Sequence, residues 1–344
     1  MKRVTLRESP KNPLAVIPTT SGGGGGIVDL VERLALPVVW LALILAFSLA
    51  MPSSFPHMGN ISAILGSQVI VLIPGFALLI PLIAGDYDLS VAYNMAFVAM
   101  VITVLNVNGH WPILPAALLG IVIGGTVGVI NAVVTLVFRI DSLIVTLGTG
   151  TLISGLAAWI SGQAVITGVS SSLVRVVAID RFLSIPLEFW YGFGMCIVLS
   201  YVLSFTPIGR RLLFVGRNRS VSQLSGIRVA RVRFGAFIVA GLIAGLGGVI
   251  LAGTLDGADP SAGPAYLLPG FAAAFLGATT LTPGRFNPWG LFIAVYFLGT
   301  GTSGLQLLGI ASWIQPVFYG GSLVLAVVFS QLVRGRQALN SGER

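Results

Sequence analysis

The sequence predicts an all-α membrane protein that crosses the bilayer about ten times. Of its 344 residues, 56% are hydrophobic and only 9% are charged, whereas a soluble domain carries about 25% charged residues. The mean hydropathy is +0.97, and apolar runs of about 20 residues, the length that spans a bilayer, recur along the chain. The arginines lie between these runs. The net charge of +8 therefore indicates membrane topology and anionic headgroups rather than nucleic acid as a partner.

The N-terminal residues 1–33 are polar and contain the low-complexity run Gly22–Gly26. Such a composition is typical of a flexible tail. The tail is too polar, and too long before the first apolar run, for an ordinary cleaved signal peptide. Its first eleven residues carry four basic side chains against Glu8 alone, so we expect it on the cytoplasmic side.

The expected spans follow one another with short connections. They are residues 34–51, 61–84, 89–105, 112–138, 143–160, 187–205, 234–254, 267–281, 288–305 and 313–332. The last segments are short and could include a re-entrant pair, so the expected range is eight to ten spans. Both termini, including the tail 335–344, are expected in the cytoplasm. The second segment contains Pro74-Gly75 and Pro81, which predict a broken helix buried in protein or beside water.

The segment 112–138 carries a ridge of small residues. They recur at every fourth position: Ala116, Gly120, Gly124, Gly128 and Ala132. This spacing places them on one helix face, where a second helix can approach closely. Gly241 and Gly245 form a similar face in segment 234–254. We expect these two faces to serve packing rather than chemistry.

The basic loop, residues 206–233, contains seven arginines and no acidic residue. Loops of this kind stay on the cytoplasmic side. Pro207 and Gly209 end the preceding helix, and Asn218 could cap a short helix that Gly226 closes. Two interpretations fit this pattern. The loop is either a docking surface for a cytoplasmic partner or a topology anchor without one.

Polar residues cluster near the end of the second span. They are Asp86, Tyr87, Asp88, Ser90, Tyr93 and Asn94, and Asn131, Thr146 and Thr149 lie in later spans. An ionisable residue at membrane depth is costly and suggests a function. Asp88 or Ser90 could instead cap the helix that follows, whereas Asp86 could face a water-filled passage. The uncharged residues could equally join helices by hydrogen bonds.

Several kinds of site are excluded by residues that the sequence lacks. Lys2 and Lys11 are the only lysines, and neither follows a glycine, so the chain has no G-x-x-x-x-G-K-[ST] phosphate loop with which to hydrolyse ATP. His57 and His110 are the only histidines, which excludes an H-E-x-x-H zinc helix. Cys196 is the single cysteine, so no internal disulfide or C-x-x-C motif can form. We therefore expect no cofactor and no enzymatic activity in this chain.

Five ordered motifs resemble those of the ribose-type sugar permeases of ATP-binding cassette (ABC) transporters. Residues 85–91, GDYDLSV, are similar to the family motif G-G-[IF]-D-L-S-V-G, and residues 144–149 match I-V-T-L-G-T. In the basic loop, residues 206–211, 216–218 and 224–227 match T-x-x-G-R-x, G-x-N and L-S-G-I, and residues 241–253 and 276–285 continue the order. The resemblance covers about residues 34–334. The chain departs from it at Asp86, Ala92, Tyr93 and Ala132, where the family usually has glycine or another small residue, and this leaves the exact sugar open.

The resemblance implies a non-catalytic permease domain, residues 34–334, of an importer in the bacterial inner membrane. It would form the passage for a monosaccharide or polyol, together with a second permease subunit, a cytoplasmic ATPase that uses the ATP, and a periplasmic binding protein. The resemblance also makes the basic loop the coupling region, and the residues expected at the ATPase are Gly209, Arg210, Arg211, Arg217, Asn218, Leu224, Ser225 and Gly226. We expect the polar cluster to border the passage. The alternatives are a related permease for nucleosides or amino acids, a proton-coupled transporter that uses Asp86 or Asp88, and an intramembrane enzyme.

Overall fold

The computed structural model describes residues 26–342, with side chains described for residues 33–328. The long helices are α1 (Gly26–Ala50), α2 (Met58–Ser67), α3 (Val69–Ile83), α4 (Val91–Thr103), α5 (Ile113–Val137), α6 (Ser142–Ile160), α8 (Leu187–Phe205), α9 (Pro207–Arg217), α11 (Val229–Thr254), α12 (Gly263–Gly277), α13 (Pro288–Leu307) and α14 (Ile314–Gly342). The short helices are α7 (Ser171–Val174), α10 (Arg219–Leu224) and two π-helical turns, Val104–Asn108 and Arg175–Ile179. Most of the predicted tail 1–33 lies outside the described residues, and α1 begins at Gly26.

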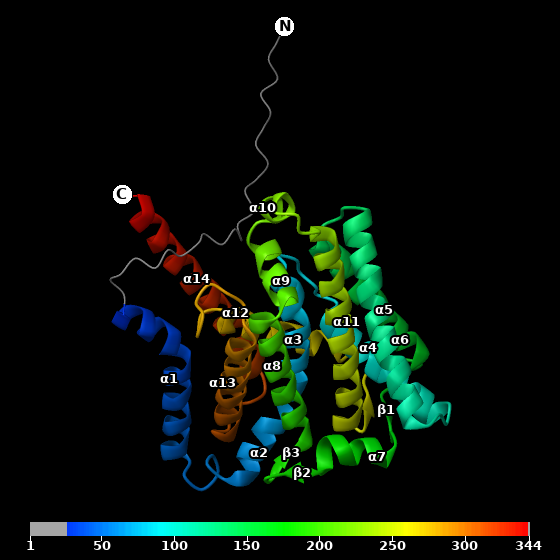
Figure 1. Cartoon of the computed structure of the whole chain (residues 1–344). Coiled ribbons are helices and arrows are strands. Elements are labelled where there is room, and N and C mark those ends of the chain that lie inside the picture. Colours follow the sequence, from blue (N-terminus) through cyan, green and yellow to red (C-terminus); the bar gives the residue numbers. More distant parts are fainter. Residues whose placement is uncertain (1–25, 343–344) are drawn as a thin grey trace.

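Eight helical segments among the described residues are long and apolar enough to cross a membrane. Two shorter apolar helices, Gly263–Gly277 and Ile314–Val328, accompany them. The predicted all-α membrane fold with eight to ten spans is thus confirmed. In Figure 1, α10 lies at one end of the bundle, towards which the start of α1 and the end of α14 also point. The positive-inside rule predicts this arrangement for the arginine-rich loop, the start of α1 and the end of α14.

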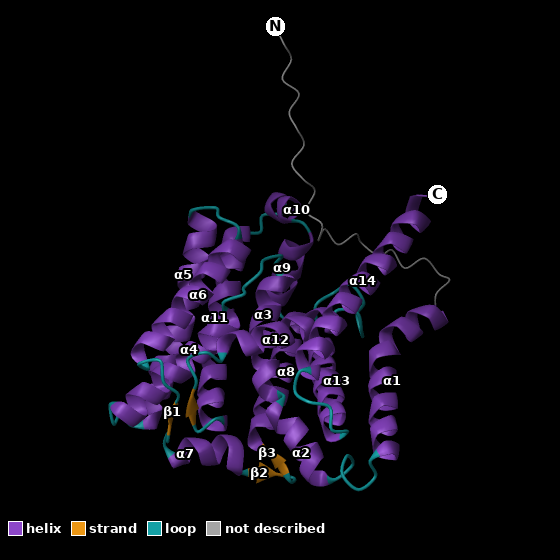
Figure 2. Ribbon diagram, turned by 180° about the vertical axis from the view of Figure 1, so that it is seen from behind, coloured by secondary structure: helices purple, strands orange, loops and turns teal. Residues whose placement is uncertain are grey.

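At the opposite end, the chain forms two small antiparallel pairs (Figure 2). Strand β1 (Ile166–Thr167) pairs with β4 (Gly257–Ala258), and Ile166 lies opposite Ala258. Strand β2 (Arg181–Phe182) pairs with β3 (Ile185–Pro186). The first pair fastens the loop after α6 to the loop after α11, whereas the second is a local hairpin just before α8.

Helix α3 forms the centre of the bundle, since every residue from Val69 to Ile83 is buried. It contacts α4, α8, α11, α12 and α13. The predicted break at Pro74-Gly75 is wrong: the helix continues through both prolines, and the interruption lies at Gln68, between α2 and α3. Gly75 serves close packing instead, because a β-carbon there would lie 3.1 Å from a methyl carbon of Leu291 on α13.

The predicted ridge of small residues on α5 packs against α11, as expected. Gly124 lies against Gly241 and Gly245, and Gly128 lies against the backbone of Phe237. No side chain separates the two helices at these points, so their backbones are in van der Waals contact. This contact holds α11 in place, and α11 carries the arginine that reaches the site described next.

Candidate functional site: the junction between α3 and α4

The junction, residues 84–90, joins the end of α3 to the start of α4. Gly85 adopts a left-handed backbone conformation, with φ of +79°, which turns the chain and which glycine adopts at little cost. Asp86 follows this turn, and its side chain is only 4% exposed. The turn therefore carries a carboxylate into a buried position.

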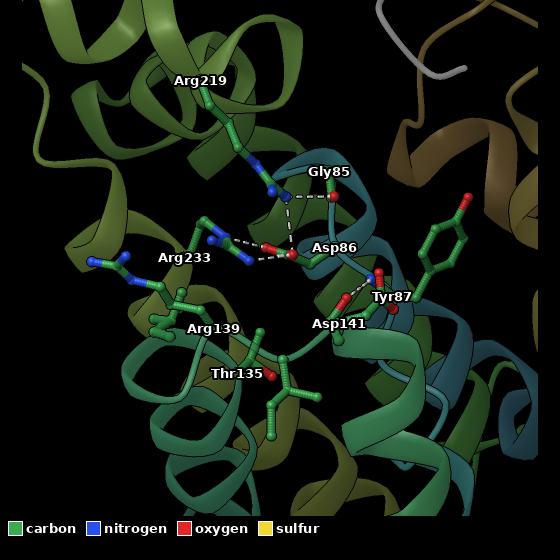
Figure 3. Close-up of a pocket in the computed structure, with 11 residues that line it drawn as sticks. Gly85, Asp86, Tyr87, Thr135, Arg139, Asp141, Arg219 and Arg233 are labelled. Atoms are coloured by element: carbon green, nitrogen blue, oxygen red, sulfur yellow. Dashed lines mark hydrogen bonds and ion pairs between the residues drawn. The ribbon is translucent and has the colours of Figure 1, made fainter. Parts of the chain in front are cut away.

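Two arginines from the basic loop neutralise Asp86 (Figure 3). Arg233 on α11 binds both carboxylate oxygens, with Nε 2.6 Å from Oδ2 and Nη2 2.7 Å from Oδ1. Arg219 on α10 donates from Nη2 to Asp86 Oδ1 at 2.9 Å and to the Gly85 carbonyl at 2.6 Å. Planar guanidinium groups suit this forked geometry, and the bonds are charge-assisted. The sequence analysis did not identify Arg219 or Arg233 as a partner of Asp86. A signal for the pairing was present, because the basic loop has no acidic residue of its own and capping did not explain Asp86.

The second acid of the junction, Asp88, is held by the residue two positions later. Asp88 Oδ1 accepts hydrogen bonds from the Ser90 backbone amide at 3.0 Å and from the Ser90 hydroxyl at 2.6 Å. Asn131 on α5 donates to the Ser90 hydroxyl oxygen at 2.8 Å. Burial raises the pKa of the Asp88 carboxyl to about 6, although the bonds from Ser90 act in the opposite direction. Asp88 thus forms a turn with Ser90, the residue just before α4, and neither side chain caps the helix amides as the sequence suggested. The network joins the start of α4 to α5.

Helix α6 holds the junction from another side. The Ser142 hydroxyl accepts from the Tyr87 amide at 3.1 Å, and the Thr146 hydroxyl accepts from the Leu89 amide at 3.0 Å. The Tyr87 ring stacks on Phe271 of α12, with centroids 6.3 Å apart. The contact with the Leu89 amide gives Thr146 a structural role. Seven helices meet at the junction through these contacts: α3, α4, α5, α6, α10, α11 and α12.

The remaining candidates lie farther along α4 and α6. Asn94 donates to the Gly124 carbonyl of α5 at 3.0 Å. Tyr93 is partly buried and packs against Gly150 on α6 and against Gly263 at the start of α12. Thr149 lies on α6, partly exposed and outside the hydrogen-bond network of the junction.

A cavity of about 480 Å³ opens beside Asp86. It is lined by Gly85, Asp86, Tyr87, Thr135, Leu136, Arg139, Ile140, Asp141, Ser142, Arg219 and Arg233. Figure 3 shows Arg219 and Arg233 pointing to Asp86, while Arg139 points away from it. Among the described residues, the buried oxygens Asn94 Oδ1, Asn131 Oδ1 and Thr135 Oγ1 near this junction have no hydrogen-bond partner. The interior here is more polar than packing alone requires.

The basic loop folds into α9 and α10. Thr206 caps α9 by accepting from the Gly209 amide at 3.2 Å. Asn218 caps α10 by accepting from the Val221 amide at 3.1 Å, and Gly226 follows in a left-handed conformation, with φ of +80°. The predicted short helix with its cap is thus present, and α9 is an additional helix that begins at Pro207.

Among the residues expected at the ATPase, those with side chains at the surface are the most informative. Arg210 and Arg211 are exposed on α9, and Leu224 at the end of α10 is 88% exposed. Arg217 is partly buried, and Ser225 is exposed and donates to the Val221 carbonyl at 3.0 Å. Gly209 is buried against the backbone of Leu203 at the end of α8. The exposed members are thus basic on α9 and apolar at the end of α10.

The model of one protein family, described as the permease component of the branched-chain amino acid transport system, matches residues 60–327. The chain belongs to this family of permeases. The L-arabinose ABC transporter permease protein of Azospirillum brasilense is 32% identical over 332 residues, which cover 96% of each chain. The ribose import permease protein of Bacillus subtilis is 32% identical over 290 residues, covering 84% of this chain and 89% of the relative.

A third relative, the D-allose transport system permease protein of Escherichia coli, is 28% identical over 294 residues, or 85% of this chain and 90% of the relative. No solved structure shows a significant match. The resemblance to sugar permeases inferred from the five motifs is confirmed. The chain is a multi-pass membrane permease of the ABC transporter type.

Proposed function

We propose that this chain is the permease subunit of a bacterial inner-membrane ABC importer for a monosaccharide or a related polyol. The similarity to the L-arabinose permease along 96% of both chains carries this proposal. The family description names amino acids, but these three relatives are named for arabinose, ribose and allose.

Ion pairing of Asp86 argues against a proton-coupled transporter that uses this residue. Two guanidinium groups bind its carboxylate at 2.6–2.9 Å, so both of its oxygens already serve as structural contacts between helices. A proton carrier must instead present its carboxylate to the transport path.

The partners follow from the proposed function. A second permease subunit, identical or different, would complete the passage in the lipid bilayer, and a periplasmic binding protein would deliver the sugar. A separate cytoplasmic ATPase would use the ATP, so this chain itself would need no cofactor, catalyse no reaction and bind no nucleic acid. The polar residues from Asp86 to Asn94, with Asn131, Thr146 and Thr149, would border the passage near its cytoplasmic end.

The ATPase would dock on α10 and its flanking residues. Leu224 is the strongest anchor candidate, because an apolar side chain that is 88% exposed beside arginines is available to a partner. Leu224→Ala should weaken binding of the ATPase about tenfold, which corresponds to about 1.4 kcal/mol. Leu308→Ala serves as the control, since Leu308 is 51% exposed just after α13, at the opposite end of the bundle. Equal binding by both variants would place the docking surface elsewhere.

Reconstitution tests the function directly. The complete transporter, assembled with its ATPase and binding protein in proteoliposomes, should take up one or more pentoses, hexoses or polyols when ATP is supplied. Uptake should continue after a protonophore collapses the proton gradient. Uptake that requires the gradient but not ATP would overturn the proposal, and so would ATP-driven uptake of amino acids or nucleosides in the absence of any sugar uptake.

A further inference from the structure

The basic loop is fastened to the junction at two places. At the first, Gly216 near the end of α9 lies directly against the Ile83 carbonyl at the end of α3, where a β-carbon would overlap it. At the second, Arg219 on α10 binds the Gly85 carbonyl and the Asp86 carboxylate. The first contact is fixed by backbone packing, whereas the second depends on side-chain charge.

Asp86 also binds Arg233 near the start of α11. One buried carboxylate therefore connects α10, α11 and the junction. The Arg219 side chain is 40% exposed and that of Arg233 is 17% exposed. Water screens the bond to α10 more than the bond to α11, so the two connections differ in strength and can be separated by substitution.

From the junction, hydrogen bonds lead to helices that lie deeper in the bundle. The Tyr87 and Leu89 amides bind hydroxyls in the first turns of α6, and Ser90 connects α4 to α5 through Asn131. A displacement of α10 that carries Asp86 with it must either move these helix ends or break these bonds. The junction is thus a continuous physical connection between the proposed docking helix and the starts of α4 and α6.

We propose that Asp86 is a positioning residue that transmits movement of α10 to the starts of α4 and α6 during the ATP cycle. The inference rests on the proposed docking of the ATPase at α10. The ionic connection through Asp86 adds to the backbone contact at Gly216, which needs no side chain.

The cleanest test removes only the bond to α10. In Arg219→Gln, Arg233 still neutralises Asp86, so the buried acid keeps a charged partner and the fold is preserved. Arg228→Gln is the matched control, because it removes the same charge from an exposed arginine at the start of α11. Asp86→Asn removes the shared carboxylate, and Asp180→Asn controls for it by removing an exposed acid just before β2, at the opposite end of the bundle.

The first readout is amide hydrogen exchange in the complex of the full chain with its ATPase. Binding of the ATPase should slow exchange of the Tyr87 and Leu89 amides about tenfold in the wild type and in the controls. In Arg219→Gln and Asp86→Asn, that protection should be lost although the ATPase still binds. An unprotected junction in the wild-type complex, or full protection in Arg219→Gln, would overturn the inference.

The second readout is the amount of sugar moved per ATP hydrolysed in proteoliposomes. This ratio should fall about fivefold in Arg219→Gln and Asp86→Asn and stay unchanged in the two controls. A wild-type ratio in both test variants would overturn the inference. A transporter that moves no sugar at all would contradict the proposed function alone, because the exchange measurement needs no substrate.

Discussion

The contact between α5 and α11 makes a quantitative prediction about Gly241. A β-carbon added there would overlap the Gly124 carbonyl, and it would lie 3.0 Å from the Gly128 nitrogen and 3.1 Å from the Gly128 α-carbon. All three are backbone atoms, so no rotamer change can relieve the overlap. In Gly241→Ala, the two helices must separate along the whole ridge of small residues.

The size of the effect follows from two opposing terms. Overpacking a buried contact costs about 1–3 kcal/mol, whereas alanine is favoured over glycine inside a helix by about 1 kcal/mol. Gly235 on the same helix isolates the second term, because a β-carbon added there would have no heavy atom of another segment within 4 Å. The free energy of unfolding should therefore be lower in Gly241→Ala than in Gly235→Ala by about 1–3 kcal/mol.

Unfolding of the purified chain in mixed micelles, followed by tryptophan fluorescence as the fraction of sodium dodecyl sulfate rises, measures this difference. The six tryptophans of the chain supply the signal. The midpoint should move to lower denaturant in Gly241→Ala and stay level or rise in Gly235→Ala. Equal midpoints would mean that the two helices tolerate separation, and the packing argument would then fail.

Three further predictions concern the activity and the polar network. The purified chain alone should hydrolyse no ATP, and phosphate release by a preparation free of other subunits would contradict this. Asn131→Ala removes the donor to Ser90 and should lower the free energy of unfolding by about 1–3 kcal/mol. Thr126→Ala, on the exposed face of α5, should change it little. Similar losses in both variants would mean that the hydrogen bond from Asn131 to Ser90 does not stabilise the fold. Tyr93→Ser should alter the relative uptake rates of pentoses, hexoses and polyols, and equal scaling of all rates would assign Tyr93 to packing.

Features that depend on local sequence could be predicted. The four-residue spacing of small side chains on α5 fixes which face another helix can approach, and the structure places α11 there. Asn218 at the start of α10 and Gly226 after it have the cap and the left-handed conformation that their residue types favour. Each of these signals is contained within one segment of the chain.

Features that depend on distant contacts could not be predicted in this way. Asp86 binds arginines that lie 133 and 147 residues later in the chain, and no periodicity connects such positions. The two ion pairs explain how the buried Asp86 carboxylate is tolerated. The continuous helix through Pro74 was equally hidden, because the packing of α4, α11 and α13 around α3 is a tertiary effect.

The acids and the amides of the polar cluster differ in what they can still bind. Asp86 is occupied by two guanidinium groups, and Asp88 accepts two bonds from Ser90. The oxygens without a hydrogen-bond partner among the described residues near the junction, on Asn94, Asn131 and Thr135, are all neutral. These oxygens are buried in this structure, so a solute would reach them only after the surrounding helices separate. The cavity itself is lined by Asp86, Arg139, Asp141, Arg219 and Arg233, and such charged groups would suit an amino acid as well as a sugar. The choice of a sugar therefore rests on the similarity to the arabinose, ribose and allose permeases and not on the polarity of the junction.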